Sequence, residues 1–415
     1  MEELQARLDD LRDRGLYRKL RLVSGPQGPR VLLNGKPVLL LCSNNYLGLA
    51  DHPRVRQAAA DAVMRWGAGA GASRLISGNM TIHRRLEERI AEFKHSEACV
   101  LFGSGYLANT GIIQALAREG DVVFSDALNH ASIVDGCRLA GARTFVYDHR
   151  DMEHLEWGLR EAGGRGALIV TDGVFSMDGD IAPLAEIVEL AHRNDARVMV
   201  DDAHGLGALG PGGRGSVAAA GLEDEVDVVV GTLGKTLGSY GAYACTSRTM
   251  AKWLVNTART LIFSTALPPP AVAAAGAALE LLAEEPRRVD RLQRNASIVR
   301  EALSDHGIRT GDSTTQILPL VVGDADDAVR VCERALEKGV FAQAIRPPTV
   351  PEGSSRLRLA VMGSHTRAEL QDAAGVLAAA LHAVVGDRPQ PAPVPLEPIS
   401  ESVPGRIYDG LAEAA

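Results

Sequence analysis

Short apolar runs alternate with amphipathic stretches between residues 98 and 246 of this chain. The runs, such as "ACVLF" and "ALIVTD", are rich in β-branched residues and are typical of buried strands. The stretches between them, such as "PLAEIVELAHRND", have the period of a helix with one apolar face. This alternation predicts an α/β fold in which a mostly parallel sheet is flanked by helices. The runs predict strands at residues 98–102, 121–125, 143–147, 167–172, 197–202, 227–232 and 241–246.

A break in this pattern falls at Pro268 to Pro270, which must end one element and can start another. Long helical patterns follow, and then three further apolar runs and a last helical stretch, which predict a smaller α+β unit. After residue 387 the chain is rich in proline and poor in residues that a core would bury, so we expect a disordered tail. The expected parts are a helical segment over residues 1–40, a large domain over 41–270, a small C-terminal domain over 271–386 and the tail over 387–415.

Composition narrows the possible partners and compartments. The 415 residues carry a net charge of −8 with both signs interspersed, so we do not expect a nucleic-acid partner. The five cysteines are scattered without a C-x-x-C pair, so neither a disulfide framework nor a metal site is expected. The N-terminus lacks an apolar core, and the apolar window "AVAAAGAALELLAEE" is too short to span a bilayer. We therefore expect a cytoplasmic protein without a membrane segment.

In an open parallel sheet, ligands bind beyond the carboxyl ends of the strands, so we expect the functional residues in the segments that follow the strands. In "LFGSGYLANTG" the backbone N–H groups from Ser104 through Gly105 to Tyr106 could hold a phosphate at a helix N-terminus, although a simple glycine turn explains the same pattern. In "DALNHASIVDG" His130 starts the next predicted helix, where it could cap the helix or lie over a flat ring. Neither segment by itself shows which of its two interpretations is correct.

A third segment, "VTDGVFSMDGDIAPLAE", ends a predicted strand with one hydroxyl and three carboxylates. Metal binding is conceivable there, but turn and capping chemistry explains the pattern more simply. The polar residues concerned are Asp172, Ser176, Asp178 and Asp180.

The last two segments are more specific. Asp201 and Asp202 end the apolar run "VMV", and His204 follows three residues after Asp201. A carboxylate at a buried strand end needs a partner, although a structural carboxylate and histidine remain an alternative. In "VVVGTLGKTLGSYGA" Lys235 stands among glycines that let a flat ligand approach the backbone. Removal from water disfavours the ammonium form, so we interpret Lys235 as a nucleophilic amine.

Together these segments meet the requirements of pyridoxal 5'-phosphate (PLP). That cofactor needs a phosphate site, a ring partner, a lysine that forms a Schiff base, and an acid at its pyridine nitrogen. Lys235 and Asp201 fit the last two roles by position.

The same residues also resemble a known family. The segments "CSNNYLGLADHP", "SDALNHASIVDG", "TDGVFSMDGDIAPL", "VDDAHGLGALGPGGRG" and "GTLGKTLGS" are similar to those of the α-oxoamine synthases, PLP-dependent transferases of fold type I. The resemblance covers about residues 15–385 and implies a homodimer with shared active sites. One departure is Asn45, because many relatives carry Asp at that position.

The resemblance assigns roles to individual residues. It implies that Lys235 holds the cofactor, that Asp201 pairs with the ring nitrogen, and that His204 and His130 contact the phenolic oxygen and the ring face. It places Ser104, Gly105, Tyr106, Ser176 and Thr232 around the cofactor, and Thr265 at the phosphate of the neighbouring subunit. For the substrates it implies Arg358 and Asn44. Arg18 and Arg21 stand where relatives carry arginines and could contact the acyl donor, although a solvated helix face explains them equally well.

The implied reaction is a decarboxylative condensation of an amino acid with an acyl thioester. By resemblance the amino acid is L-alanine, and the acyl donor is pimeloyl-coenzyme A or a pimeloyl carrier protein. Condensation of glycine with acetyl-coenzyme A is the alternative within the family. A PLP aminotransferase and a non-catalytic glycine-rich nucleotide-binding module are alternatives outside it, and the latter leaves Lys235, Asp201 and His204 unexplained as a set.

Overall fold

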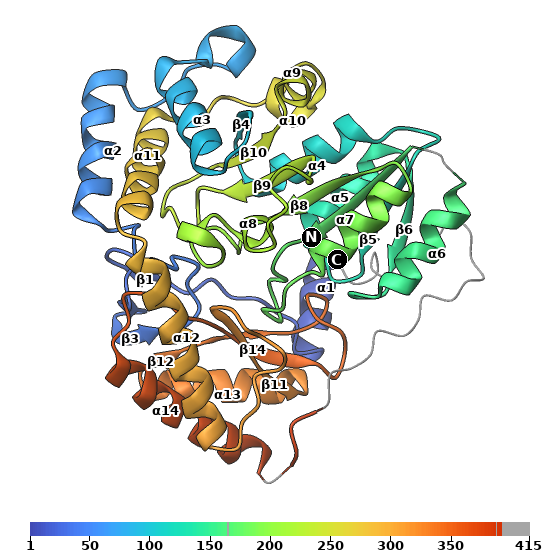
Figure 1. Cartoon of the computed structure of the whole chain (residues 1–415). Helices are drawn as coiled ribbons and strands as arrows, with labels where there is room; N and C mark the ends of the chain where they lie inside the picture. Colours follow the sequence, from blue (N-terminus) through green and yellow to red (C-terminus); the bar gives the residue numbers. More distant parts are fainter. Residues whose placement is uncertain (164–165, 387, 392–415) are drawn as a thin grey trace.

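The computed structural model describes residues 1–163, 166–386 and 388–391. The chain forms two lobes, an upper lobe around a large sheet and a lower lobe around two smaller ones that combines the N-terminal and C-terminal parts of the chain (Figure 1). Most of the predicted tail over 387–415 lies outside the described residues. Its first part does make contacts, because Arg388 pairs with Asp327 at 2.8 Å and the side chain of Gln390 accepts a hydrogen bond from the backbone N–H of Arg309.

The large sheet has seven strands in the order β4-β10-β9-β8-β7-β5-β6. All pairs are parallel except those of β10, which is antiparallel to both β4 and β9. The predicted α/β fold with a mostly parallel sheet is thereby confirmed. The strands are β4 (Ala98–Phe102), β5 (Val122–Asp126), β6 (Arg143–Tyr147), β7 (Ala167–Asp172), β8 (Ala196–Asp201), β9 (Val228–Thr232) and β10 (Ala242–Thr246).

Both faces of this sheet are buried, which explains why its strands read as continuous apolar runs. Val228 and Val230 pack in one hydrophobic cluster, whereas Val229 between them packs in the other. The helices of the upper lobe cover these two faces. They are α2 (Pro53–Trp66), α3 (Thr81–Phe93), α4 (Gly105–Leu116), α5 (Ala131–Ala140), α6 (Met152–Ala162), α7 (Leu184–Arg193), α8 (Ser216–Ala219), α9 (Arg248–Thr257), α10 (Arg259–Ile262) and α11 (Pro269–Glu284), with a π-helical turn at Arg74–Gly78 and a 3-10 turn at Pro211–Gly213.

The lower lobe has its own core, around a three-stranded antiparallel sheet in the order β11-β14-β13. A second sheet in the order β1-β2-β3-β12 lies beside it and joins the N-terminal segment to the C-terminal part of the chain. The elements are β1 (Val23–Ser24), β2 (Arg30–Leu33), β3 (Lys36–Leu40), β11 (Ile317–Gly323), β12 (Val340–Phe341), β13 (Gln343–Ile345), β14 (Ser355–Ala360), α1 (Glu2–Asp13), α12 (Arg287–Asp305), α13 (Ala325–Glu337) and α14 (Arg367–Val385).

The N-terminal segment differs from the expectation that residues 1–40 are helical. Only α1 is helical there, and residues 23–40 form three strands. Asn34 and Gly35 have φ values of 50° and 81°, so they form the tight turn that an Asn-Gly pair favours between two strands. The alternating side chains Val31 and Leu33 are buried in the core of the lower lobe, and this burial decides the strand conformation.

Helix α11 bears on the predicted domain boundary at residue 270. Helix α11 begins in the proline run and packs with α2 and α3 on the core of the upper lobe, so the predicted boundary at residue 270 stays a prediction.

Helix α14 is, in the described part of the chain, the one helix long and apolar enough to cross a membrane. Its apolar residues, such as Leu370 and Leu377, are buried in the core of the lower lobe.

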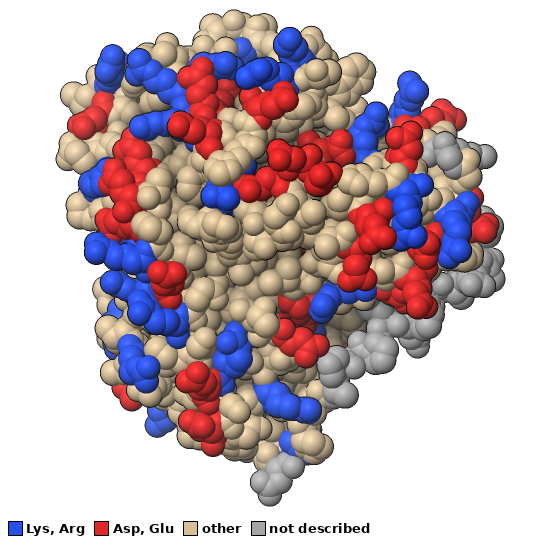
Figure 2. All heavy atoms as spheres, viewed as in Figure 1, with Lys and Arg blue, Asp and Glu red and all other residues tan. Residues whose placement is uncertain are grey.

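The charged side chains on the face shown in Figure 2 are mixed in sign. Blue and red atoms lie next to one another over both lobes, and neither forms a continuous surface. This face therefore lacks the basic stripe typical of nucleic-acid binding.

Candidate active site

The carboxyl ends of the central strands bring most of the predicted residues together between the two lobes. Asp201 ends β8, Thr232 ends β9 and Lys235 follows in the next turn. Helix α4 begins after Ser104, and α5 begins after His130. From the lower lobe, β14 contributes Arg358.

Lys235 is bonded to the histidine predicted beside it. Its Nζ lies 2.7 Å from Nε2 of His204. Burial lowers the pKa of Lys235 from 10.5 to about 8, with Arg358 acting in the same direction and Asp201 opposing it. The amine is therefore far more often neutral near neutral pH than that of an exposed lysine, which is what a nucleophilic amine requires.

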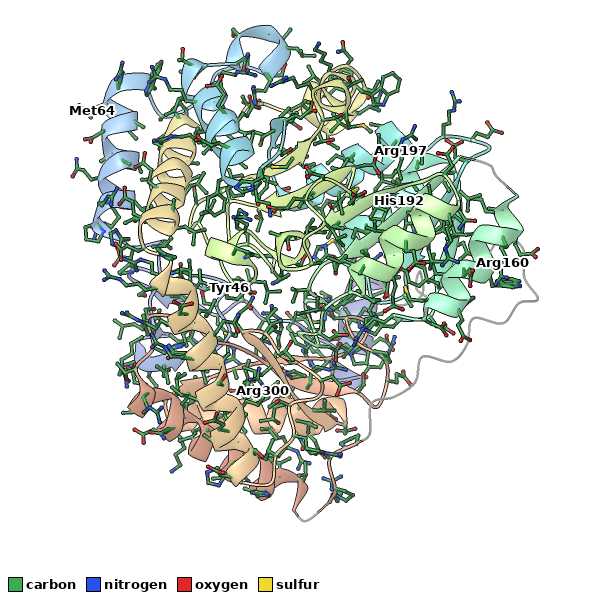
Figure 3. All side chains as sticks on the ribbon, in the orientation of Figure 1. Tyr46, Met64, Arg160, His192, Arg197 and Arg300 are labelled. Atoms are coloured by element: carbon green, nitrogen blue, oxygen red, sulfur yellow. The ribbon has the colours of Figure 1, made fainter. Side chains whose placement is uncertain are left out.

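His204 is a neutral imidazole held from both sides. Its pKa is lowered well below 6.5, first by burial and then by the positive charges of Lys235 and Arg358. Its Nδ1 lies 2.6 Å from the hydroxyl of Tyr46, and its carbonyl oxygen accepts a hydrogen bond of 2.9 Å from Nε2 of Gln316. This network fixes the ring next to the amine. Figure 3 shows Tyr46 at the level where the two lobes meet.

Asp201 and Asp202 have separate environments, because consecutive residues at a strand end point to opposite faces. Asp201 accepts hydrogen bonds from Nδ2 of Asn109 at 2.6 Å and from the backbone N–H of Ala203 at 2.9 Å. Asp202 instead pairs with the buried Nζ of Lys94 at 3.0 Å and accepts two hydrogen bonds from Ser216. Asp202 is thus committed to a structural ion pair, whereas Asp201 accepts from two uncharged donors.

His130 lies beside Asp201 at the start of α5. Its Nδ1 is 2.7 Å from Oγ of Ser132, and its backbone N–H donates to Asp172 at 3.1 Å. Burial lowers the pKa of His130, although Asp201 opposes this, and burial together with the charge of Asp201 raises the pKa of Asp172 well above 3.8. A neutral imidazole with a polar edge fixed by Ser132 is suited to lying over a flat ring.

The segment from Asp172 to Asp180 contacts β14 of the lower lobe. Asp178 pairs with Arg356, and Asp180 lies 2.8 Å from Nε2 of His149. The backbone oxygen of Ser176 accepts a hydrogen bond from Nε of Arg358. Among the described residues no group of His, Cys, Asp or Glu could hold a metal ion.

The predicted phosphate-side residues lie at the start of α4 and after β9. Oγ of Ser104 accepts a hydrogen bond from the backbone N–H of Leu107, whereas the N–H groups of Gly105 and Tyr106 have no partner among the described residues. Oγ1 of Thr232 donates to the carbonyl of Gly241. The side chain of Tyr106 points elsewhere, because its hydroxyl bonds to Asp135.

Thr265 belongs to a different part of the surface. It is exposed and forms an isolated β-bridge with Ser73, next to the π-helical turn. Its predicted place at a neighbouring subunit stays a prediction.

Arg358 is buried and points toward the residue predicted to act with it. Its Nη1 donates to Oδ1 of Asn44 at 3.1 Å, and its Nη2 lies 3.4 Å from the hydroxyl of Tyr46. Asn45, the departure from the family pattern, faces away and hydrogen-bonds to the backbone of Gln27 and Ala50. It supports the loop that carries Asn44 and Tyr46.

The two N-terminal arginines lie in different places. Arg18 lines a cleft of about 2960 Å³ that also reaches His130 and Ser176. Arg21 does not line this cleft; its guanidinium pairs with Glu333 and stacks over Phe341, with 5.3 Å between the Arg21 Cζ and the ring centroid. Arg18, but not Arg21, therefore lines the cleft that reaches His130 and Ser176.

The residues that sequence reasoning missed are Tyr46, Asn109 and Gln316, all of which touch a predicted site residue. Tyr46 follows Asn44 in the quoted segment "SNNYLG", and Asn109 follows the predicted phosphate turn. Their place in these segments was the available signal. The position of these residues in the sequence does not indicate which polar atoms their side chains contact.

The described residues fit PLP. Lys235, whose pKa is lowered to about 8, lies near the strand-end carboxylate of Asp201 and near His130, whose pKa is lowered by burial. Two unpaired N–H groups stand at the N-terminus of the 12-residue helix α4, which favours an anion. A Cβ built on Gly105 would meet nothing within 4 Å, so the space beside this turn is open.

Comparisons with known proteins agree with this geometry. The family model described as aminotransferase class I and II matches residues 36–377. The 8-amino-7-oxononanoate synthase of Citrifermentans bemidjiense is 54% identical over 380 residues, which cover 91% of this chain and 97% of that protein. The enzyme of the same name from Geobacter sulfurreducens is 53% identical over 374 residues, covering 89% of this chain and 96% of that one.

Solved structures give the same picture. A serine palmitoyltransferase from S. paucimobilis with a bound adduct of PLP and myriocin matches with a TM-score of 0.88 at 33% identity, over 92% of this chain and 97% of that one. An 8-amino-7-oxononanoate synthase from Francisella tularensis matches with a TM-score of 0.72 at 26% identity, over 82% of this chain and 97% of that one.

Proposed function

The chain belongs to the aminotransferase class I and II family, and we propose that it condenses L-alanine with a pimeloyl thioester to give 8-amino-7-oxononanoate, carbon dioxide and a free thiol. It has the PLP-dependent fold of type I. The observation that carries the proposal is that one site holds Lys235, whose pKa is lowered to about 8, together with Asp201 and Arg358, whose charges both act on that pKa. The product is a precursor in biotin biosynthesis, the pathway of these relatives.

When bound, PLP supplies an electron sink for the bond broken at Cα of the amino acid. Asp201 is placed to hold a proton at the ring nitrogen, because its two donors fix the carboxylate at the end of β8. His130 is placed to cover the ring, and His204 to hydrogen-bond to the phenolic oxygen. Ser104, Gly105, Tyr106, Ser176 and Thr232 complete the surroundings that we assign to the cofactor.

Lys235 has two tasks in this proposal. Its amine would hold the cofactor and, when free, would accept the proton from Cα of the substrate amino acid. A pKa of about 8 suits both tasks, because the free amine must be neutral to take up a proton near neutral pH. His204, 2.7 Å away, keeps the amine in position.

Arg358 is assigned to the carboxylate of the amino acid. A guanidinium can hold a carboxylate through two parallel hydrogen bonds, and Asn44 and Ser176 fix it in the site. This contact recognises every amino acid, so the preference for alanine over glycine must come from the shape of the pocket. One methyl group contributes about 1–3 kcal/mol to such a preference.

The acyl donor is assigned to the cleft that contains Arg18. A pimeloyl chain ends in a second carboxylate, which needs a cation or water. The exposed side chain of Arg18 in the cleft supports this role. Arg21 remains a candidate, although its pairing with Glu333 leaves it less available.

We assign the complete site to a homodimer. Around Thr265 the surface carries large apolar side chains in the open, among them Ile76, which is 80% exposed, and Phe263, which is 72% exposed. Exposed apolar side chains gathered in one place are typical of a protein interface. Thr265 would then reach the phosphate of the partner's cofactor. We also place the enzyme in the cytoplasm.

A panel of substrates tests the proposed function. The purified protein, loaded with PLP, is incubated with L-alanine or glycine and with pimeloyl or acetyl thioesters, on coenzyme A or on a carrier protein, and thiol release is followed. We expect L-alanine with a pimeloyl thioester to give the highest kcat/KM, and Arg18→Ala to weaken the pimeloyl substrate more than an uncharged acyl chain of equal length. A wide margin in favour of glycine with acetyl-coenzyme A would refute the substrate assignment and leave the cofactor site intact.

A further inference from the structure

Asn109, on α4, connects two of the assigned cofactor contacts through one side-chain amide. The side chain is fully buried, and its Nδ2 lies 2.6 Å from Oδ2 of Asp201 and 2.9 Å from Oγ of Ser132. Oγ of Ser132 in turn lies 2.7 Å from Nδ1 of His130. A continuous chain of hydrogen bonds therefore runs from the carboxylate to the imidazole.

The orientation of the amide follows from its partners. An ionised carboxylate only accepts hydrogen bonds, so the nitrogen of Asn109 must face Asp201; exchanging nitrogen and oxygen would set two acceptors 2.6 Å apart. The nitrogen carries two hydrogens, and the second points at Ser132. Oδ1 of Asn109 has no partner among the described residues, so the two donor contacts alone set the orientation.

The orientation of the amide then decides where the proton of His130 is. Because Oγ of Ser132 accepts from Asn109, its own hydrogen is free to point at Nδ1 of His130. The backbone N–H of Ser132 also faces this atom, at 3.3 Å. With two donors directed at Nδ1, the neutral ring carries its hydrogen on Nε2.

We propose that Asn109 is a positioning residue that fixes the carboxylate of Asp201 and, through Ser132, the Nε2–H tautomer of His130. The proposal rests on the proposed function only in that these two residues are assigned to the cofactor. A buried asparagine that served packing alone would affect stability but not the protonation of a ring two hydrogen bonds away.

Asn109→Asp tests this directly, because it keeps the shape and reverses the polarity. Two carboxyl groups in contact share one proton, and that proton lies between them. The oxygen of Asp at position 109 that faces Ser132 is then an acceptor. The Ser132 hydroxyl turns to donate to it, and the Ser132 oxygen can then accept from Nδ1 of His130. At 2.7 Å this contact is shorter than the one between Nδ1 and the backbone N–H of Ser132, at 3.3 Å, and should outweigh it. We expect the tautomer of His130 to change from Nε2–H to Nδ1–H.

The measurement is nitrogen-15 NMR of the histidine rings in the cofactor-free protein near neutral pH. The matched control is Asn295→Asp, since Asn295 is also buried and donates both hydrogens, but to the backbone oxygens of Met362 and His365. The control should leave His130 as Nε2–H. In Asn109→Asp combined with Ser132→Ala, the tautomer should no longer respond to the change at position 109.

Cofactor affinity is the second readout. Asn109→Leu removes a hydrogen bond to a charged group and should weaken PLP binding by roughly tenfold or more, whereas Asn295→Leu should not. Asn109→Asp should bind PLP better at low pH, where the shared proton preserves the contact with Asp201, than at high pH, where both carboxylates are charged.

An Nε2–H ring in folded Asn109→Asp would overturn the proposal. If that variant fails to fold, Asn109→Leu decides, because it removes the donor to Asp201 without adding a charge. A PLP affinity equal to that of the wild type would then overturn the proposal. The tautomer is measured without substrate or cofactor. A protein with other substrates would still give the expected result, so failure of this inference and failure of the proposed function are distinguishable.

Discussion

The protonation of Lys235 gives the sharpest prediction, because two charges act on it with opposite sign. The pKa of Lys235 is lowered to about 8 by burial and by Arg358, and it is raised by Asp201. At pH 7.5 a pKa of about 8 leaves about a quarter of the amines neutral, against about one in a thousand for a lysine at 10.5. The lowering corresponds to about 3 kcal/mol of differential interaction.

Two substitutions should move this pKa in opposite directions. Arg358→Gln removes a positive charge, so the pKa of Lys235 should rise from about 8 toward 10.5. Asp201→Asn removes a negative charge, so the pKa should fall below about 8. The matched control is Arg356→Gln on the same strand, since Arg356 pairs with Asp178 and is not among the charges that shift Lys235.

The assay is reductive methylation of the cofactor-free protein with carbon-13 formaldehyde, followed by NMR titration of the dimethylamine signals. The signal of Lys235 is identified by its loss in Lys235→Arg. A wild-type midpoint near 10.5 would show that the amine is not desolvated. Shifts of the same sign in Arg358→Gln and Asp201→Asn would show that the charges around the amine are not arranged as described.

Three further predictions concern stability and assembly. The pKa of His149 is raised to about 9, because the hydrogen bonds from its ring to Asp126 and Asp180 outweigh the effect of burial. Its contribution to stability is therefore full below pH 6.5 and is lost as the pH rises through 9, so in His149→Gln the melting temperature should depend less on pH over this range. Lys94→Met leaves the fully buried Asp202 without its counter-ion and should cost about 3–5 kcal/mol in denaturant unfolding, whereas a loss below 1 kcal/mol would contradict an ionised pair. Mixing inactive Lys235→Ala with an inactive Thr265 variant should restore activity through hybrid dimers, and an active monomer in light scattering would refute the shared site.

The sequence by itself was sufficient for the architecture around the large sheet. Every predicted run between residues 98 and 246 forms a strand, because a strand buried on both faces must be apolar along its length. It was also sufficient to propose Lys235, Asp201 and His204, since each follows a strand whose carboxyl end faces the ligand side. The N-terminal strands were missed because two to five residues of alternating polarity are a weak signal, and their buried partners lie about 300 residues away.

Tertiary structure alone decided which polar atoms meet. From the sequence, Asp201 and Asp202 are neighbours of the same type; in the fold one faces Asn109 and the other the buried Lys94, because the end of the strand directs them to opposite sides. The lobes likewise bring Arg358 within reach of Asn44, 314 residues earlier in the chain. Periodicity reports which side of an element is buried, whereas hydrogen bonds and charges act over a few ångströms between distant segments, and only the packed chain sets those distances.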